Sequence, residues 1–189
     1  LLPPGKGPHP ALVASHGHAE DADQFLRLQD GASLPNEGVA ILVHTQRASM
    51  ADADEDRAAR ALLAAGGSLM AVRAYEVSVG LAFLRRHEAI DNNRIGLIGH
   101  SGGSLANLLT IRLVEGFAAH ITDGIAEYNS WDHGLIADES LPSLYPASGQ
   151  LSDLSRAPVP SVEYEYGYPE GLKQAALFIM NSRHLTNKD

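Results

Sequence analysis

Residues 94–103 read Arg-Ile-Gly-Leu-Ile-Gly-His-Ser-Gly-Gly. Residues 94–99 have the composition of a strand buried on both faces and end at a glycine. Residues 104–114 follow at once and predict a helix. Between them lies a G-x-S-x-G pattern centred on Ser101. A serine on a sharp strand-to-helix turn must take a strained backbone conformation, which raises its hydroxyl above the edge of the sheet, so the pattern predicts Ser101 as a nucleophile.

The same junction predicts a site that can hold a negatively charged oxygen. The backbone N–H of Gly102 would lie at the N-terminus of the helix, where free N–H groups and the helix dipole stabilise an oxyanion. A second donor is expected from the loop after an earlier strand, residues 11–15, where the sequence reads His16-Gly17-His18-Ala19. The backbone N–H of His18 or Ala19 is the candidate. His100, beside the serine, is expected to pack or hydrogen-bond rather than act as the base.

The remaining sequence alternates apolar strands with helical segments. The second helix of the pair between residues 54 and 87 carries one apolar stripe at spacings of three and four residues, which suits packing on a sheet. The expected elements are a strand at 11–15, a helix at 20–30 closed by Gly31, a strand at 39–43, two helices between 54 and 87 broken at Gly66-Gly67, a strand at 94–99, a helix at 104–114, a strand at 121–128, a polar loop at 129–158, a strand at 162–166 and a helix at 172–180. This order predicts a single α/β domain over residues 1–189, with a parallel sheet covered by helices on both faces.

Composition excludes several classes of function. The chain has 14 Lys and Arg against 23 Asp and Glu, a formal net charge of -9, which disfavours a nucleic-acid surface. No apolar run approaches the ~20 residues that span a bilayer, so a membrane role is not supported. The absence of cysteine excludes disulfides and thiolate catalysis but does not indicate a compartment. An enzyme acting on a small neutral substrate fits this balance best, and the oligomeric state is left open.

From about residue 8 to residue 116 the chain resembles the α/β-hydrolase superfamily, and in particular its dienelactone-hydrolase and acetyl-xylan-esterase type. The matching segments are Pro10–Val13 leading to His16-Gly17, and Asp91–Gly103. The resemblance implies a serine esterase that cleaves a small-molecule ester through an acyl-enzyme on Ser101, with no cofactor. Such proteins have further strands before the His-Gly loop and a last strand and helix near the C-terminus. Since Leu1-Leu2 also reads like the tail of a strand, we expect a domain that is incomplete at its N-terminus and at its C-terminus.

The resemblance also implies a carboxylate and then a histidine after the serine. Glu170 is the best-aligned acid, because Gly167-Tyr168-Pro169-Glu170 follows the strand where the family carries its acid. Asp132 and Glu139 are rivals in the long loop. His133 is the candidate base, since it lies in a loop on the same sheet edge as Ser101 and could fold inward. His184 follows Glu170 by a helix of ~12 residues, which would carry it to the opposite edge, so the base could also lie outside this chain.

Two alternatives from other classes stay open. His16 and His18, with Asp21, could bind zinc, as in metallo-β-lactamase-like hydrolases. That family needs Asp and His where this chain has Glu20 and Asp21, so the run fits an oxyanion loop better, and no metal site is predicted. A non-catalytic binding protein could also keep the fold without the chemistry.

Overall fold

The computed structural model of the chain describes residues 1–49, 52–123, 159–163 and 176–181. Its centre is a five-stranded sheet in the order β2-β1-β3-β4-β5, with every neighbouring pair parallel. The elements are β1 (His9–Ser15), α1 (Ala22–Leu28), the 3₁₀ helix η1 (Gly31–Glu37), β2 (Ala40–Val43), α2 (Asp52–Ala64), α3 (Leu69–Leu84), β3 (Ile90–His100), α4 (Gly102–Leu113), β4 (His120–Asp123) and β5 (Ser161–Glu163). Residues 176–181 form a further short helix.

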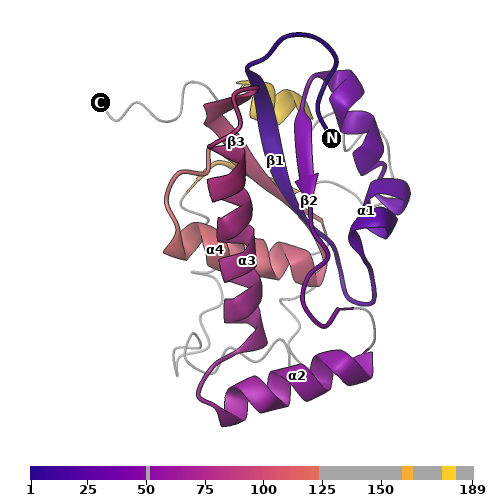
Figure 1. Ribbon diagram of the computed structural model, residues 1–189, viewed down its shortest axis with the longest axis vertical. Helices are drawn as coiled ribbons and strands as arrows, with labels where there is room; N and C mark the ends of the chain where they lie inside the picture. The colour runs from indigo at the N-terminus through magenta and orange to yellow at the C-terminus, as the bar shows by residue number, and fades with distance from the viewer. Residues whose placement is uncertain (50–51, 124–158, 164–175, 182–189) are drawn as a thin grey trace.

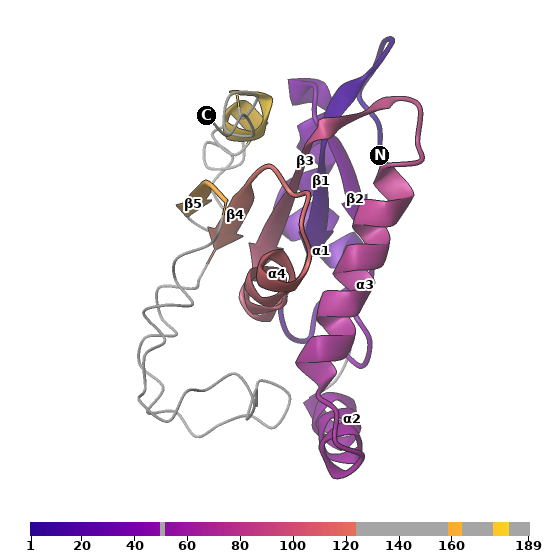
Figure 2. The same ribbon diagram turned by 90° about the vertical axis from the view of Figure 1, so that its left-hand side faces the viewer.

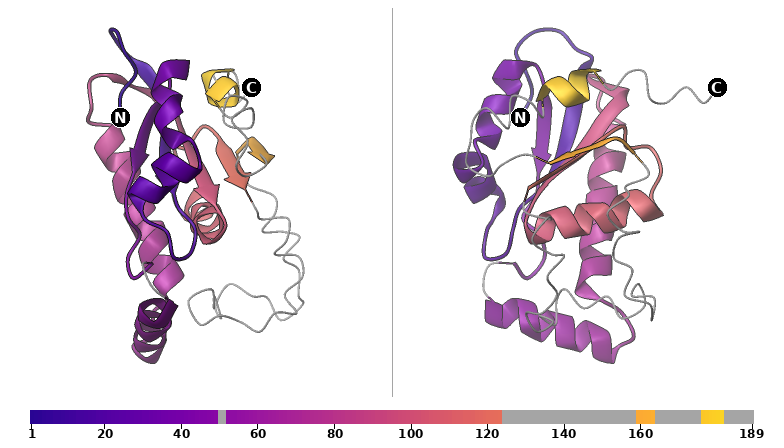
Figure 3. Two further views of the ribbon diagram at one scale, coloured as in Figure 1. Left: turned by 90° about the vertical axis from the view of Figure 1, so that its right-hand side faces the viewer. Right: turned by 180° about the vertical axis from the view of Figure 1, so that it is seen from behind.

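Helices cover both faces of the sheet, which confirms the predicted architecture (Figures 2 and 3). On one face α1, η1 and the helix at 176–181 supply Phe25, Leu34 and Ile179 to a buried cluster with residues of β1, β2, β3 and β4. On the other face α3 and α4 form a second cluster with the alternate residues of the strands. Successive strand side chains point to opposite faces, so each central strand needs apolar residues at consecutive positions. The predicted apolar stripe of α3 is buried throughout, at Met70, Ala74, Val77, Leu81 and Leu84.

The strand order fixes where a ligand can bind. After β1 the chain passes through α1, on one face, to β2 on one side of β1. After β3 it passes through α4, on the other face, to β4 on the opposite side. The direction in which the chain moves across the sheet therefore reverses between β1 and β3. In open α/β sheets, ligands bind outside the carboxyl ends of the strands at such a reversal. The loop after β1 and the turn after β3 flank this position. The amphipathic helix α2 lies beyond the same edge of the sheet (Figure 1).

The structure corrects two local predictions. β3 begins at Ile90 and not at residue 94, and Asp91–Asn93 form an irregularity within the strand, in which Asp91 Oδ1 accepts from the backbone N–H of Asn93 at 3.0 Å. Gly31 does not close α1: that helix ends at Leu28, and Gly31 instead begins η1, where its backbone packs on the Phe25 ring. The fourth and fifth strands are described only over His120–Asp123 and Ser161–Glu163, so their predicted extensions lie outside the described residues.

Within the described helices, none is by itself long and apolar enough to cross a membrane. The segments Asp54–Ala64 and Leu69–Leu84 reach that length and composition only together, as a pair bent by 100°.

At the edge of the sheet, Leu1 exchanges two backbone hydrogen bonds with Ile41 of β2, at 2.9 and 3.0 Å.

Candidate active site

Ser101 occupies a strained turn between β3 and α4. Its backbone angles are φ 49° and ψ −123°, a combination that residues with a Cβ rarely adopt. It is the N-cap residue of α4, and its carbonyl oxygen accepts from the N–H of Ser104 at 2.9 Å. The helix begins at Gly102, two residues earlier than predicted, so the Gly102 N–H lies in its first turn. The serine therefore lies half-buried at the positive end of a helix dipole.

Gly99 and Gly103, the first and last residues of the G-x-S-x-G pattern, lie too close to neighbouring backbone atoms to carry a side chain. A Cβ on Gly103 would lie 2.3 Å from the carbonyl oxygen of Ser15 and 2.4 Å from that of His16. A Cβ on Gly99 would lie 2.7 Å from the backbone of Ser104. The first turn of α4 thus packs directly on the end of β1, as expected for a serine raised on a tight bend.

The loop after β1 lies against this turn. A Cβ on Gly17 would be 3.2 Å from Ser101 Cβ, and a Cβ on Gly102 would be 2.4 Å from Cε1 of the His18 ring. His18 and Gly102, the two residues predicted to bind an oxyanion, are therefore in contact, beside the serine. Ala19, the other candidate donor, has a positive φ of 55°. This arrangement brings together three of the predicted site residues.

Glu20 holds this loop to the turn. Its Oε2 accepts from the backbone N–H of Gly17 at 2.8 Å and lies 3.1 Å from Nδ1 of His100. Burial acts to raise the pKa of Glu20, but the hydrogen bonds from His100 and Gly17 outweigh it and lower that pKa below its usual value. The His100 ring thus hydrogen-bonds to Glu20, in line with the expectation that it hydrogen-bonds or packs. Sequence reasoning missed Glu20 because a carboxylate three residues after a glycine carries no recognisable signal.

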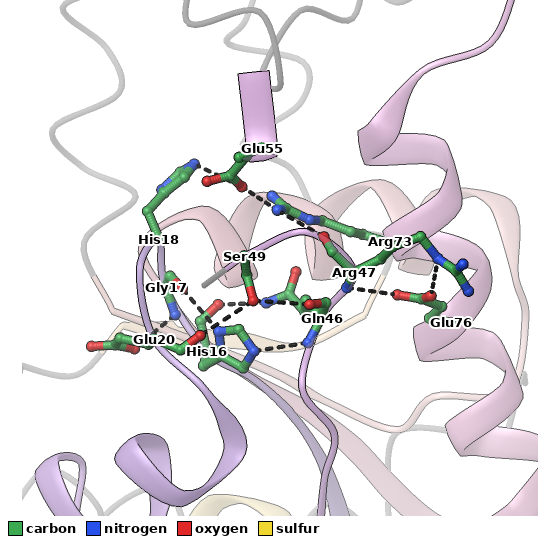
Figure 4. A network of polar contacts seen from close by, with 10 residues as sticks. All are labelled: His16, Gly17, His18, Glu20, Gln46, Arg47, Ser49, Glu55, Arg73 and Glu76. Atoms are coloured by element: carbon green, nitrogen blue, oxygen red, sulfur yellow. Dashed lines mark hydrogen bonds and ion pairs between the residues drawn. The ribbon is translucent and has the colours of Figure 1, made fainter. Parts of the chain in front are cut away.

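His16 anchors the same loop from beneath (Figure 4). Its Nδ1 lies 2.8 Å from the carbonyl oxygen of Gly17, and its Nε2 accepts from the backbone N–H of Gln46 at 2.8 Å. A carbonyl can only accept, so Nδ1 carries the proton and Nε2 is the acceptor. Ser49 adds to the network by donating to the carbonyl oxygens of Gln46 and Glu20.

This geometry opposes the zinc alternative. Both ring nitrogens of His16 are engaged with the protein, so neither is available as a ligand without breaking a buried hydrogen bond. Burial lowers the pKa of His16 and keeps it neutral. Asp21 is the N-cap of α1, with its side chain accepting from the N–H of Gln24. In the part of the chain described, no three His, Asp or Glu side chains are grouped as a metal site.

A buried ion pair lies on the other side of His18. Glu55 of α2 and Arg73 of α3 are 3% and 2% exposed, and an Arg73 Nη2 contacts Glu55 Oε1. The same guanidinium donates to the carbonyl oxygen of Arg47 at 3.2 Å. Nε2 of His18 lies 3.8 Å from Glu55 Oε1. Figure 4 shows the three side chains in a row from the loop to α3. No sequence signal predicted this cluster, because its members come from three separate elements.

The predicted acid and base fall outside the described residues. This holds for Glu170 and His133, for the rival acids Asp132 and Glu139, and for His184, which was expected at the opposite edge of the sheet. Their roles stay predictions. What the structure describes is the strained turn at Ser101 and the loop beside it.

Solved structures share this fold. A putative acetyl xylan esterase from Bacteroides fragilis matches 96% of the chain at 17% identity with a TM-score of 0.70. A glucuronoyl esterase from Solibacter usitatus matches 93% at 13% identity with a TM-score of 0.56. A cold-adapted esterase from an Arctic intertidal metagenomic library matches 97% at 15% identity with a TM-score of 0.55. The chain therefore has the α/β-hydrolase fold, as its sequence predicted.

The match is partial in length for most of these proteins. The chain spans 59% of the Bacteroides protein and 62% of the glucuronoyl esterase, but 85% of the metagenomic esterase. No protein-family model matches the sequence, and no curated protein matches it significantly.

Proposed function

We propose that this chain is a serine hydrolase that cleaves carboxylic esters through an acyl-enzyme on Ser101. The observation that carries the proposal is the backbone of Ser101, at φ 49° and ψ −123°, on the first turn of α4 and against the loop of Gly17 and His18. Strain of this kind persists only where the surrounding structure enforces it, and it clusters at functional sites. A turn that merely started a helix would have no need of it.

The chemistry follows from the positions of the groups. Ser101 Oγ attacks the ester carbonyl, its proton passes to a base, and the carbonyl electron pair moves onto oxygen. The N–H of Gly102 and the backbone N–H of His18 or Ala19 are the proposed donors to that oxyanion. Collapse expels the alcohol, which takes the proton from the base, and leaves the acyl group on the serine. Water then releases the acid by the same steps.

His133 remains the proposed base and Glu170 the proposed acid, with Asp132 and Glu139 as rival acids. The three neighbours of the same fold are named as esterases, which favours carboxylic esters among acyl substrates. Small uncharged esters also suit a chain with a formal net charge of -9.

A fluorophosphonate probe, followed by peptide mass mapping, tests the nucleophile. We expect one labelled residue, Ser101, and none in Ser101→Ala. Hydrolysis of a series of p-nitrophenyl esters of increasing acyl length should be lost in the same variant. A well-folded protein that neither reacts with the probe nor hydrolyses esters would contradict the proposal and favour a binding protein.

The base and acid are tested separately. His133→Gln and Glu170→Gln should each lower kcat by about 10³-fold or more, since triad members act as a unit. The labelling rate at Ser101 should fall in parallel. If the wild type is active and the kcat of His133→Gln is unchanged, His133 is excluded as the base. If the kcat of Glu170→Gln is unchanged, Asp132 and Glu139 become the candidate acids.

A further inference from the structure

The side of α3 that faces away from the sheet carries three large apolar side chains. Tyr75, Val79 and Phe83 are 68%, 49% and 58% exposed, although the helix buries its opposite side in the core. They are spaced by four residues, so they lie along one side of the helix. Figures 1 and 2 show α3 as an outer layer of the fold, with no other described element over this side. We call these three residues the α3 strip.

The charged residues of α3 do not interrupt this strip. Between Leu69 and Leu84 the helix has two of them, and each is engaged with another part of the protein. Arg73 is buried in its ion pair with Glu55. Glu76 pairs with the exposed Arg47 at 2.9 Å. A helix that is apolar on its outer side as well as its inner side is typical of one that is covered on both. We therefore expect a partner over the strip.

A hollow borders the strip. It has a volume of about 430 Å³ and is open to solvent. Apolar side chains form part of its lining, together with a hydroxyl group and two guanidinium groups: Ser78, Leu81, Ala82, Arg85, Arg86 and Val114. Ser78 and Ala82 are the chain neighbours of Val79 and Phe83. The same helix thus presents protruding rings and a recess beside them, and interfaces are anchored by aromatic side chains that fill such pockets.

The strip is symmetric about Val79. Tyr75 and Phe83 lie four residues before and after it, which is ~6 Å along the helix axis in each direction. If two copies of α3 cross in opposite directions at a two-fold axis through Val79, each Tyr75 meets Phe83 of the other copy, and Val79 meets Val79. Each Tyr75 ring also arrives beside the hollow. A two-fold interface needs such a surface, because the same patch of both copies must be complementary to itself.

The charges near the ends of the strip agree with this antiparallel arrangement. Arg86 is exposed just beyond the C-terminal end of α3, whereas Glu76 lies in its N-terminal half. With the axis at Val79, Arg86 of one copy arrives opposite position 72 of the other, four residues or ~6 Å along the helix from Glu76. An arginine side chain can span that distance. A parallel pair would instead place Arg86 against Arg86, which is unfavourable.

We propose that the α3 strip is the interface of a two-fold homodimer, in which α3 packs antiparallel to α3 of a second copy about Val79. This proposal does not depend on the esterase reaction. A contact made mainly by one helix of each copy buries less than the ~1,600 Å² of a standard stable interface. We therefore expect a dimer that dissociates at micromolar concentrations.

Sedimentation velocity of the wild type, from about 1 to 500 µM, tests the association. We expect the mean mass to rise from that of one chain toward that of two. Val79→Glu and Phe83→Glu place like charges at the interface and should each weaken dimerisation by about 100-fold or more. Leu28→Glu is the matched control, because Leu28 is 56% exposed at the end of α1, which covers the opposite face of the sheet. It should associate like the wild type.

A cysteine placed on the axis provides a geometric test, because the chain contains no cysteine of its own. In Val79→Cys the two thiols face each other, so oxidation by copper phenanthroline should form a disulfide-linked dimer that a reductant separates. Ala71→Cys is the control on the same exposed side of α3. Its two thiols would lie ~24 Å apart along the helices, too far for a disulfide, and it leaves the strip intact.

Three outcomes would overturn the homodimer. One is a wild type that stays monomeric up to about 500 µM, which would assign the strip to a different occupant. Another is association that is unchanged in both Val79→Glu and Phe83→Glu, since the dimer would then use another surface. The last is equal cross-linking of Val79→Cys and Ala71→Cys. Because the substituted side chains are exposed, thermal melts should match the wild type, and fluorophosphonate labelling of Ser101 in Val79→Glu reports on the esterase proposal separately.

Discussion

Oε2 of Glu20 lies 3.1 Å from Nδ1 of His100 while it accepts from the N–H of Gly17 at 2.8 Å. A single carboxylate oxygen therefore joins the loop after β1 to the residue that precedes the serine on β3. These two strands are the pair at which the chain order of the sheet reverses. The distance between the proposed nucleophile and the proposed oxyanion loop depends on this contact.

Glu20→Gln should destabilise the protein by about 1 to 2 kcal/mol at pH 7, as expected when a hydrogen bond to a charged group becomes neutral. The pKa of Glu20 is lowered in the folded state, so its contribution is present above the usual value of 4.5 and is lost as pH falls through the folded pKa. The difference between variant and wild type should therefore shrink below pH 4.5. Urea unfolding measured from pH 7 to about pH 3 checks this.

Glu37→Gln is the control, because Glu37 is exposed at the end of η1. Its unfolding free energy should stay within about 0.5 kcal/mol of the wild type. A Glu20→Gln difference that stayed constant across the pH range would contradict the role assigned to the charge.

Gly103→Ala should unfold the protein or destabilise it by about 3 kcal/mol or more. The new methyl would meet two backbone carbonyl oxygens, of Ser15 and His16, that no side-chain rotation can move. Gly67→Ala is the matched control, because a Cβ there meets the Leu62 carbonyl oxygen at an ordinary 3.6 Å. Differential scanning calorimetry of the pair checks the prediction, which fails if both variants melt alike.

His120 should make the protein sensitive to mild acid. Burial lowers the pKa of this β4 side chain from 6.5 to about 4. In the unfolded chain His120 binds a proton more readily than in the folded protein. The free energy of unfolding is therefore at its full value above pH 6.5 and decreases as pH falls toward 4, by about 3 kcal/mol in all. His120→Leu should flatten this part of the unfolding curve, measured in urea at pH 7, 6, 5 and 4.

Thr122→Val serves as the control, because Thr122 is buried on the same strand but does not titrate in this range. It should retain the full pH dependence of the wild type. A His120→Leu protein with unchanged pH dependence would assign the acid sensitivity elsewhere, for which His16 and His44 are candidates because burial lowers the pKa of each.

The elements that the sequence predicted well are those with a single dominant signal. Apolar strands that are buried on both faces, and the stripe on α3, follow from burial alone, and the strained serine follows from the spacing of two glycines. The bounds of β3 were missed because Asp91–Asn93 is typical of a turn, and the turn exists, but inside a continuing strand. The turn at Asp91–Asn93 is a local feature, whereas the sheet pairing that continues on both sides of it depends on β1, which lies far away in the sequence.

The polar network around the serine could not be predicted for a different reason. Glu20, Gln46, Glu55 and Arg73 acquire their roles only when loops from separate strands and helices meet at one edge of the sheet. A surface carboxylate and a buried, ion-paired carboxylate look alike in a sequence. Tertiary contact decides between them, as it does for Glu55, which precedes an exposed Asp56 in an acidic run.

The strain at Ser101 should itself be measurable. A non-glycine residue at φ 49° and ψ −123° carries about 1 to 3 kcal/mol of backbone strain, which glycine would relieve. Glycine also loses about 0.5 to 1 kcal/mol more conformational entropy on folding. Ser101→Gly should therefore gain stability, by about 1 kcal/mol, as it loses all labelling by a fluorophosphonate, whereas Ser101→Ala should lose the labelling without the gain. Equal melting temperatures for the two variants would mean that the turn is not strained, and the proposal that rests on it would lose its support.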